Sequence, residues 1–406
     1  MNVLHWGKLS KTAVVLLSGI MCFMLSPVAA FAADSVTFDK QYTDAAQGTG
    51  SAGGKWIWDG GTGLTLDNYD GAAFEADGDI NLNLVGGNHI GTSADDEFAI
   101  LVNEGDTEEG NLTITGEPEA SLTIDSVPAE EGALQAGIYA DNDITIDGTK
   151  VDVKVDSSEE LWVSGIESNG DLAINNATVN SSAKGSNASG LLSWGNTTIS
   201  NSTVNAVGIG TNDTLGSGIT VISADTSEML SVSAVVDNVT IDSSRTLNID
   251  NSNVYAQGSS FAMAVGGNTQ GNQSAINITN SAITVPEGAA VQDFQVSWPG
   301  IIGKLYGKTI GTGSGTITSV ADPNLVKAVT ISTGAKPPTS APAEISQADS
   351  GTAQATSTTT QPLSASVESS IPQTGDSSLA LILCGSFLLV GIGGVVFARR
   401  KARFNS

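Results

Sequence analysis

The chain has 406 residues, and its 43 acidic residues far outnumber its 16 lysine and arginine residues, which gives a formal net charge of −27. A protein this acidic lacks the basic surface that binding to nucleic-acid phosphates needs, so nucleic acid is excluded as a main partner. The 47 glycines and the aromatic content of 5% suit a turn-rich β protein better than a helical one.

Residues 1–33 have the features of a secretory signal peptide. Two lysines precede an apolar run over residues 12–25, which is too short to span a bilayer comfortably. Small residues separated by one position follow this run, as signal peptidase requires. An uncleaved anchor helix is the alternative, and Pro27 argues against it because it interrupts the apolar run. The residues of the predicted cleavage site are Ala30, Ala32 and Ala33.

Residues 34–75 contain two segments whose composition favours strands. Aromatic and β-branched residues are concentrated in Trp56-Ile57-Trp58-Asp59 and in residues 64–69. Because repeats follow these segments in the chain, we expect them to cover the first apolar rung of a solenoid as an N-terminal cap.

Residues 76–290 repeat a six-residue pattern. Each copy begins with isoleucine, has glycine or asparagine at its third position and a small residue at its fourth, and ends in valine or isoleucine. The copies start 28, 25, 50 and 29 residues apart, and we interpret the interval of 50 as two units, one of them disguised around Ile219 to Ile241. A glycine followed by isoleucine or leucine precedes the first three copies at a constant interval. The copies start at Ile146, Ile174, Ile199, Ile249 and Ile278.

A repeat of this length predicts a stacked architecture. One unit carries short strands that cannot bury a core alone, whereas stacked units bury the recurring apolar side chains in one column. Glycine and asparagine accept a left-handed backbone bend, so the third position predicts a tight corner between two strands. Stacked asparagine amides at this corner can hydrogen-bond along the axis as a ladder. The residues of the predicted ladder are Asn176, Asn201, Asn251 and Asn280.

The repeat resembles the right-handed parallel β-helix of the polysaccharide-lyase-like superfamily, which includes non-catalytic carbohydrate-binding and adhesin proteins. The resemblance covers about residues 75–290 and rests on the form of the repeat, without an active-site motif of that superfamily. It implies an all-β, right-handed solenoid, and the handedness is taken from the resemblance. A left-handed hexapeptide helix is disfavoured by the period near 25 residues, and an array of β-sandwiches is the alternative fold.

The acidic residues and the histidine of this region are candidates for catalysis and for metal binding. A hydrolase needs paired carboxylates, but the acidic runs between the first coils are more typical of a solvated loop. Clustered carboxylates also suit Ca²⁺, which makes Asp95, Asp96 and Glu97 a candidate calcium site. His89 is expected in a surface turn without a partner, and a general base is the alternative role.

Aromatic side chains are the candidate glycan-binding residues, since sugar rings stack on exposed aromatic rings. Tyr139 takes the position that Glu167 and Leu192 take in the next two coils, while Trp162 and Trp194 lie in neighbouring loops. Structural packing is the alternative role for Tyr139, Trp162 and Trp194.

Two segments follow the repeats. Residues 291–332 carry scattered aromatic residues and are expected to cap the C-terminal end of the solenoid. Over residues 333–370 the composition changes to Pro, Ser, Thr, Ala and Gln, with almost no bulky apolar side chain. Such a segment cannot offset its ordering entropy by burial, so we expect an extended linker that crosses a cell wall.

The last segment, residues 371–406, has three parts in a fixed order. The pentapeptide Ile371-Pro372-Gln373-Thr374-Gly375 precedes an apolar run over residues 379–397, and a basic cluster ends the chain. At helical rise the apolar run spans about 28 Å, enough for the hydrocarbon core of a bilayer. The basic cluster would hold the end on the cytoplasmic side. An ordinary tail anchor behind a chance pentapeptide is the alternative.

This tail resembles the cell-wall sorting signal of Gram-positive surface proteins, the Leu-Pro-x-Thr-Gly family, with Ile371 in place of the usual leucine. The resemblance implies a sortase that cuts between Thr374 and Gly375 and joins Thr374 to an amine of the peptidoglycan precursor. Cys22 and Cys384, the two cysteines, lie in the end segments that processing would remove, so the mature chain would hold no thiol.

The sequence therefore predicts a secreted protein that is covalently attached to the peptidoglycan of a Gram-positive cell wall, with a sortase as its processing partner. We expect an adhesin or carbohydrate-binding protein without catalysis, whose ligand is a host or dietary glycan and whose one candidate cofactor is Ca²⁺. A wall-displayed polysaccharide lyase or glycoside hydrolase is the alternative, and a purely structural spacer is a third interpretation.

Overall fold

The computed structural model describes residues 36–38, 45–94, 96–103, 110–126, 134–157, 162–211, 214–223, 244–267, 270–297 and 304–334, all within one compact unit. The regular elements of these residues are all strands, which confirms the expected all-β class for this part of the chain. Among the same residues, no helix is long and apolar enough to cross a membrane. The predicted signal peptide, the sorting signal and nearly all of the linker lie outside the described residues.

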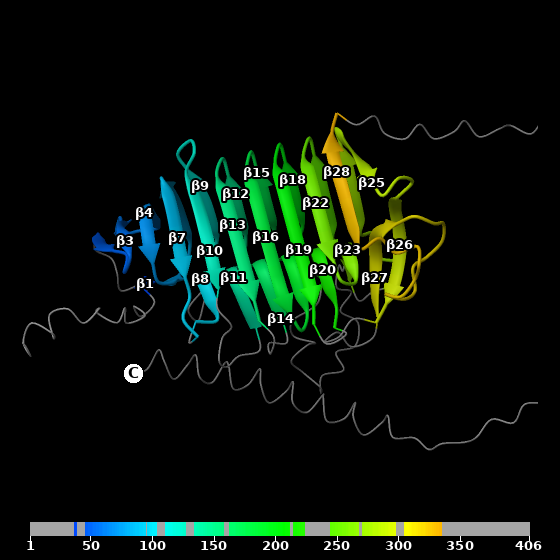
Figure 1. Cartoon of the computed structure of the whole chain (residues 1–406), viewed down its shortest axis with the longest axis horizontal. Helices are drawn as coiled ribbons and strands as arrows, with labels where there is room; N and C mark the ends of the chain where they lie inside the picture. Colours follow the sequence, from blue (N-terminus) through cyan, green and yellow to red (C-terminus); the bar gives the residue numbers. More distant parts are fainter. Residues whose placement is uncertain are drawn as a thin grey trace, which may run out of the picture. The chain divides into compact units, whose positions relative to one another are not determined.

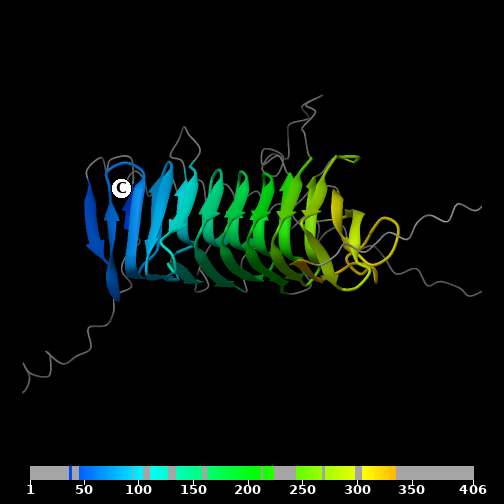
Figure 2. The same ribbon diagram turned by 90° about the horizontal axis from the view of Figure 1, so that it is seen from above.

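Successive coils place their strands in three columns, and within each column neighbouring strands run parallel (Figure 1). Viewed from above, the coils follow one another along a single axis (Figure 2). The first column holds β6 (Ile80–Val85), β9 (Leu112–Gly116), β12 (Ile144–Asp147), β15 (Leu172–Asn175), β18 (Thr197–Ser200), β21 (Thr246–Asp250) and β24 (Ala275–Thr279).

The second and third columns complete each coil. The second holds β7 (Gly87–Gly91), β10 (Ser121–Ser126), β13 (Lys150–Asp156), β16 (Thr178–Gly185), β19 (Thr203–Gly210) and β22 (Asn253–Gly258). The third holds β1 (Val36–Phe38), β5 (Phe74–Asp77), β8 (Phe98–Asn103), β11 (Leu134–Ala140), β14 (Trp162–Ser168), β17 (Ala188–Ser193), β20 (Gly216–Ser223) and β23 (Phe261–Gly267). Stacked parallel strands of this kind confirm a solenoid and rule out an array of sandwiches over these residues.

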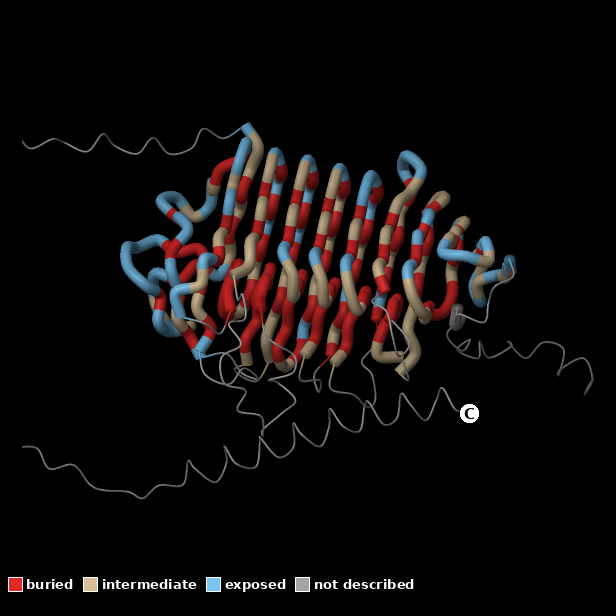
Figure 3. The backbone as a smooth tube through the Cα atoms, turned by 180° about the vertical axis from the view of Figure 1, so that it is seen from behind, coloured by how far each residue is buried: buried red, intermediate tan, exposed pale blue. Residues whose placement is uncertain are grey.

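The recurring isoleucines form the core, as the repeat predicted. Ile114, Ile146, Ile174, Ile199 and Ile249 are consecutive partners across the first column, and each is fully buried. Figure 3 shows the same alternation of buried and less buried residues along successive rungs. Burying one such side chain stabilises the fold by about 1.5–3 kcal/mol, so the column supplies a large share of the stability.

The third position of each repeat is a left-handed corner, as expected. Gly148 has a φ of 67°, and the four asparagines at this position have φ values between 46° and 53°. The small residue that follows each corner is buried, and the serines there link consecutive coils: the Ser202 amide donates to Ser252 Oγ at 3.1 Å, and the Ser252 amide donates to Ser281 Oγ at 3.0 Å. The asparagines are Asn176, Asn201, Asn251 and Asn280.

The interval of 50 residues holds one coil, so the prediction of two units there is wrong. β18 pairs directly with β21, with Ile199 opposite Ile249, and β19 pairs directly with β22. The extra length lies between the end of β20 at Ser223 and the start of β21 at Thr246, outside the hexapeptide itself. An insertion between strands and a complete extra rung give the same spacing, and the strand pairing distinguishes them.

The strands at both ends of the solenoid are antiparallel. At the N-terminal end, β2 (Ala46–Thr49) and β3 (Gly53–Trp58) form a hairpin that pairs with β4 (Gly63–Gly71), and β4 runs parallel to β6 and β7. At the other end the antiparallel strands are β25 (Ser281–Val285), β26 (Ala290–Val296), β27 (Leu305–Gly311) and β28 (Ala328–Thr333). β2, β3 and β27 lie within the ranges where the sequence predicted caps, whereas the antiparallel β25 lies within residues 76–290, which the sequence predicted to be coils.

Candidate functional site

The third column carries the aromatic residues that the sequence singled out. Tyr139 lies in β11, and its partners in the next two strands are Glu167 and Leu192, which confirms the predicted register. The preceding residues of these strands belong to the apolar core. Because side chains alternate along a strand, this row faces away from the core.

The ring of Tyr139 is packed against other side chains. It is 7% exposed, and its centroid lies 5.1 Å from that of Phe98. Its hydroxyl donates to Asp141 Oδ1 at 2.7 Å and accepts a bond from Asn169 Nδ2, also at 2.7 Å. A ring in this position has little free face, so packing, the alternative named above, describes Tyr139 better than glycan stacking.

The rings of two tryptophans lie close together. Trp162 is the first residue of β14, and Trp194 directly follows β17. The rings of Trp162 and Trp194 have centroids 6.4 Å apart and are inclined by 50°, and both side chains are partly exposed. The Arg245 Nε atom donates to the main-chain oxygen of Trp194 at 2.7 Å, which holds the residue from the next coil. This pair therefore presents indole surface from a fixed position.

Glu167 lies beside the tryptophans. The sequence pattern did not identify it as a candidate functional residue. The side chain is 3% exposed, and Trp194 Nε1 donates to its Oε1 at 3.2 Å. Burial raises the pKa of the Glu167 carboxyl, hydrogen bonds from Trp194 and Ser164 oppose the rise, and repulsion from Asp141 adds to it. The folded chain therefore holds the proton of this carboxyl more tightly than a solvent-exposed glutamate would.

These side chains form one group, which we call the Glu167 cluster. It combines a buried carboxyl, a second carboxyl held by a tyrosine hydroxyl, and two partly exposed indole rings. Such a set can stack against an apolar ring face and hydrogen-bond to hydroxyl groups. The members are Tyr139, Asp141, Trp162, Glu167, Asn169 and Trp194. One sequence feature could have identified Glu167: it is an acidic residue at a repeat position that the neighbouring coils fill with Tyr139 and Leu192.

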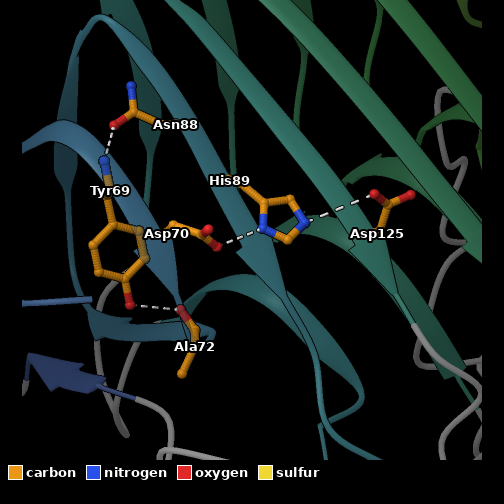
Figure 4. A network of polar contacts seen from close by, with 6 residues as sticks. All are labelled: Tyr69, Asp70, Ala72, Asn88, His89 and Asp125. Carbon is orange, nitrogen blue, oxygen red and sulfur yellow. Dashed lines mark hydrogen bonds and ion pairs between the residues drawn. The ribbon is translucent and has the colours of Figure 1, made fainter. Parts of the chain in front are cut away.

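His89 lies on another face, and the structure corrects its predicted surroundings. It belongs to strand β7, instead of a turn, and it has two carboxylate neighbours (Figure 4). Its Nδ1 lies 2.8 Å from Asp70 Oδ1 in β4, and its Nε2 lies 3.7 Å from Asp125 Oδ2 in β10. The expectation of a histidine without a partner is therefore wrong.

The candidate calcium residues are placed only in part. Asp96 Oδ2 accepts hydrogen bonds from the amide and the hydroxyl of Ser93, at 2.7 and 2.8 Å, and Glu97 precedes β8. Asp95 lies outside the described residues. Within the ranges that the structure describes, no group of three or more His, Cys, Asp or Glu side chains could hold a metal ion. The calcium site stays a prediction.

The corner asparagines form a mixed ladder. Asn251 Nδ2 donates to Asn201 Oδ1 at 2.8 Å, the amide-to-amide contact that the sequence predicted. Asn176 and Asn280 donate instead to aspartates of the preceding coil, Asp147 at 3.1 Å and Asp250 at 2.7 Å. Hydrogen bonds from Thr279 and Asn280 lower the pKa of Asp250. The corner row therefore has a structural role.

The residues of the predicted processing sites lie outside the described part of the chain. They are Ala30, Ala32 and Ala33 at the signal-peptide end, and Ile371, Pro372, Gln373, Thr374 and Gly375 in the sorting signal.

In comparisons with known proteins, no protein-family model, no curated protein and no solved structure matches this chain.

Proposed function

We propose that this chain is a secreted surface protein that a sortase attaches to Gram-positive peptidoglycan, and that its solenoid binds a glycan without cleaving it. In this proposal the solenoid is a right-handed parallel β-helix of the polysaccharide-lyase-like superfamily, in its non-catalytic, adhesin-like branch. The Glu167 cluster is the binding site.

The proposed attachment rests on the two ends of the sequence. An N-terminal export signal and a C-terminal pentapeptide, apolar run and basic cluster occur in the order that wall attachment requires. A linker poor in apolar residues stands between the solenoid and the pentapeptide, where a wall-crossing spacer belongs.

The observation that carries the binding proposal is the contact of Trp162 and Trp194 beside a buried carboxyl. Partly exposed indole rings supply flat apolar surface for the faces of sugar rings. The side chains of Asp141 and Asn169, which are partly exposed, can exchange hydrogen bonds with hydroxyl groups of a ligand. The net charge of −27 would repel polyuronates, so we propose a neutral glycan as the ligand.

A glycan array probed with the full-length chain tests this proposal. We expect retention on one class of neutral glycan. Trp194→Ala should weaken it about 5- to 150-fold if a sugar ring gains as much from the indole as a stacked nucleic-acid base does, about 1–3 kcal/mol. Tyr255→Ala is the matched control, because Tyr255 is an exposed aromatic residue on the second column, 37% exposed. Equal binding by both variants, or no retained glycan, would contradict the proposal.

The second candidate is a polysaccharide lyase or glycoside hydrolase. The observation in its favour is that burial, with a smaller contribution from repulsion by Asp141, raises the pKa of Glu167, an arrangement that suits a general acid and a second carboxylate. Turnover assays on uronate-containing and neutral polysaccharides, with and without Ca²⁺, separate the two candidates. Sustained release of oligosaccharide that Glu167→Gln abolishes would favour the enzyme.

A further inference from the structure

His89 is held between two carboxylates that come from different coils. Nδ1 is 2.8 Å from Asp70 Oδ1, and Nε2 is 3.7 Å from Asp125 Oδ2, on the opposite side of the ring (Figure 4). The histidine side chain is 42% exposed, and those of Asp70 and Asp125 are 48% and 60% exposed. The group is open to solvent and to ions.

The contact with Asp70 determines which nitrogen of His89 carries the proton. An ionised carboxylate can only accept a hydrogen bond, so Nδ1 donates to Asp70. In the neutral ring Nε2 then has no proton, and its lone pair points toward Asp125. Two electron-rich atoms that face each other in this way attract whatever positive charge can lie between them, either a proton on Nε2 or a metal cation.

The distance between the two atoms suits a metal ion better than a hydrogen bond. At 3.7 Å, Nε2 and Asp125 Oδ2 are too far apart for a hydrogen bond. A Zn²⁺ ion about 2.0–2.1 Å from each atom fits between them at an angle of roughly 130°, and a small rotation of the exposed Asp125 brings this toward the tetrahedral value. Imidazole nitrogen with carboxylate oxygen is a ligand pair that zinc and neighbouring transition metals accept.

Asp70 takes the place of the outer partner that metal-binding histidines need. Such histidines almost always donate their other ring N–H to a carboxylate or carbonyl, which fixes the ring and makes the binding nitrogen more basic. The 2.8 Å contact between Nδ1 and Asp70 supplies this partner before any ion binds.

The strands that carry the three residues are tied together directly beside them. The buried Asn88, next to His89, accepts from the amide of Tyr69, next to Asp70, at 2.9 Å. Asn88 Nδ2 also donates to the carbonyl of Ser121 at the start of β10, at 3.2 Å. Tyr69 is itself buried and donates to the Ala72 carbonyl at 3.0 Å. These bonds hold β4, β7 and β10 in register and thus prearrange the ring and both carboxylates.

We propose that His89 Nε2 and Asp125 bind a divalent transition-metal ion of the zinc class, with Asp70 as the residue that orients His89. Solvent oxygens complete the coordination, because the protein supplies two ligands. This site is independent of the Glu167 cluster and of glycan binding.

Nitrogen NMR of the full-length chain with ¹⁵N-labelled histidine tests the site. The chain has two histidines, His5 and His89, so the ring signals are few, and His89→Gln assigns those of His89. Without metal, at a pH where the ring is neutral, we expect a proton on Nδ1 and a free Nε2. Titration with Zn²⁺ should move the Nε2 signal while the Nδ1 proton remains.

Three isosteric variants complete the test. Asp125→Asn should remove the response of Nε2 to Zn²⁺, and Asp70→Asn should weaken the affinity about 10–100-fold, the usual effect of losing an outer partner. Asp156→Asn is the control, because Asp156 is an exposed carboxylate on β13 paired with Lys184, and it should leave the response unchanged. The proposal is overturned if both ring nitrogens are protonated and insensitive to Zn²⁺, or if Asp125→Asn responds like the original chain.

Discussion

Burial of the Glu167 carboxyl makes the stability of the solenoid depend on pH. Burial raises the pKa of this group above its ordinary value of 4.5, so the folded chain holds the proton more tightly than the unfolded chain does. Below pH 4.5 the Glu167 carboxyl is protonated in both the folded and the unfolded chain, so its burial costs little free energy of folding. As the pH rises above that value, the folded state must either keep the proton or bury a charge, and stability is lost.

Glu167→Gln should remove this loss. Glutamine keeps the shape and can still accept the bond from Trp194, but it does not ionise. We expect the variant to gain stability relative to the original chain as the pH rises from 4 to 8, by on the order of 1–3 kcal/mol, the usual cost of a poorly solvated buried polar group. Thermal unfolding of both chains across this range measures the difference. Parallel stability curves would show that Glu167 is not buried.

His89 illustrates what a residue pattern cannot show by itself. Its partners are 19 residues before it and 36 after it, in the strands on either side. Neighbouring outward side chains belong to different coils, so their contacts follow from the register of the strands. The first copies of the repeat are weak, and without the register around β4, β7 and β10 no partner could be assigned.

At the scale of strands, the glycine that precedes each repeat allows the strands of the second and third columns to pack closely against each other. Gly137, Gly165, Gly190 and Gly218 lie at equivalent places in the third column. A Cβ atom on Gly190 would lie 2.5 Å from the amide nitrogen of Val207 and 2.8 Å from the carbonyl oxygen of Gly218. Both are main-chain atoms, which cannot move aside as a flexible side chain can. The recurring glycine is therefore a packing requirement.

Gly190→Ala should destabilise the solenoid by about 1–3 kcal/mol or more, the usual cost of overpacking. Gly87→Ala is the matched control: Gly87 is an exposed glycine of β7, and the nearest atom to its added Cβ is Ser121 Oγ at 3.9 Å. It should be neutral, or stabilising by less than about 1 kcal/mol. Denaturant unfolding of the two full-length variants measures both effects, and equal losses would contradict this explanation.

The sequence predicted more about the elements than about their connections. The hexapeptide located the isoleucine column and the left-handed corners because both follow from local residue preferences. It gave the wrong number of units between Ile199 and Ile249, since an insertion after β20 and a complete rung add similar numbers of residues. Pairing across a solenoid decides between them, and pairing is not a local property.

At the scale of the whole molecule, the proposed attachment predicts where the protein is found in the cell. In fractionated Gram-positive cells, the chain should appear in the wall fraction after muramidase digestion, with Thr374 joined to a peptidoglycan fragment. Thr374→Ala should move it to the membrane and the medium, because the sortase would no longer recognise the residue whose acyl group it transfers, whereas Ser370→Ala should stay in the wall. Equal wall yields from both variants would contradict sortase attachment.

We propose that this solenoid holds a neutral glycan at the Glu167 cluster and leaves it intact. The most direct measurement is a crystal structure of the full-length chain with an oligosaccharide chosen from the array. We predict a sugar ring stacked on Trp162 or Trp194, a hydroxyl group hydrogen-bonded to Asp141 or Asn169, and an oligosaccharide of undiminished length. An oligosaccharide bound on another face, or a shortened product in the site, would contradict the account.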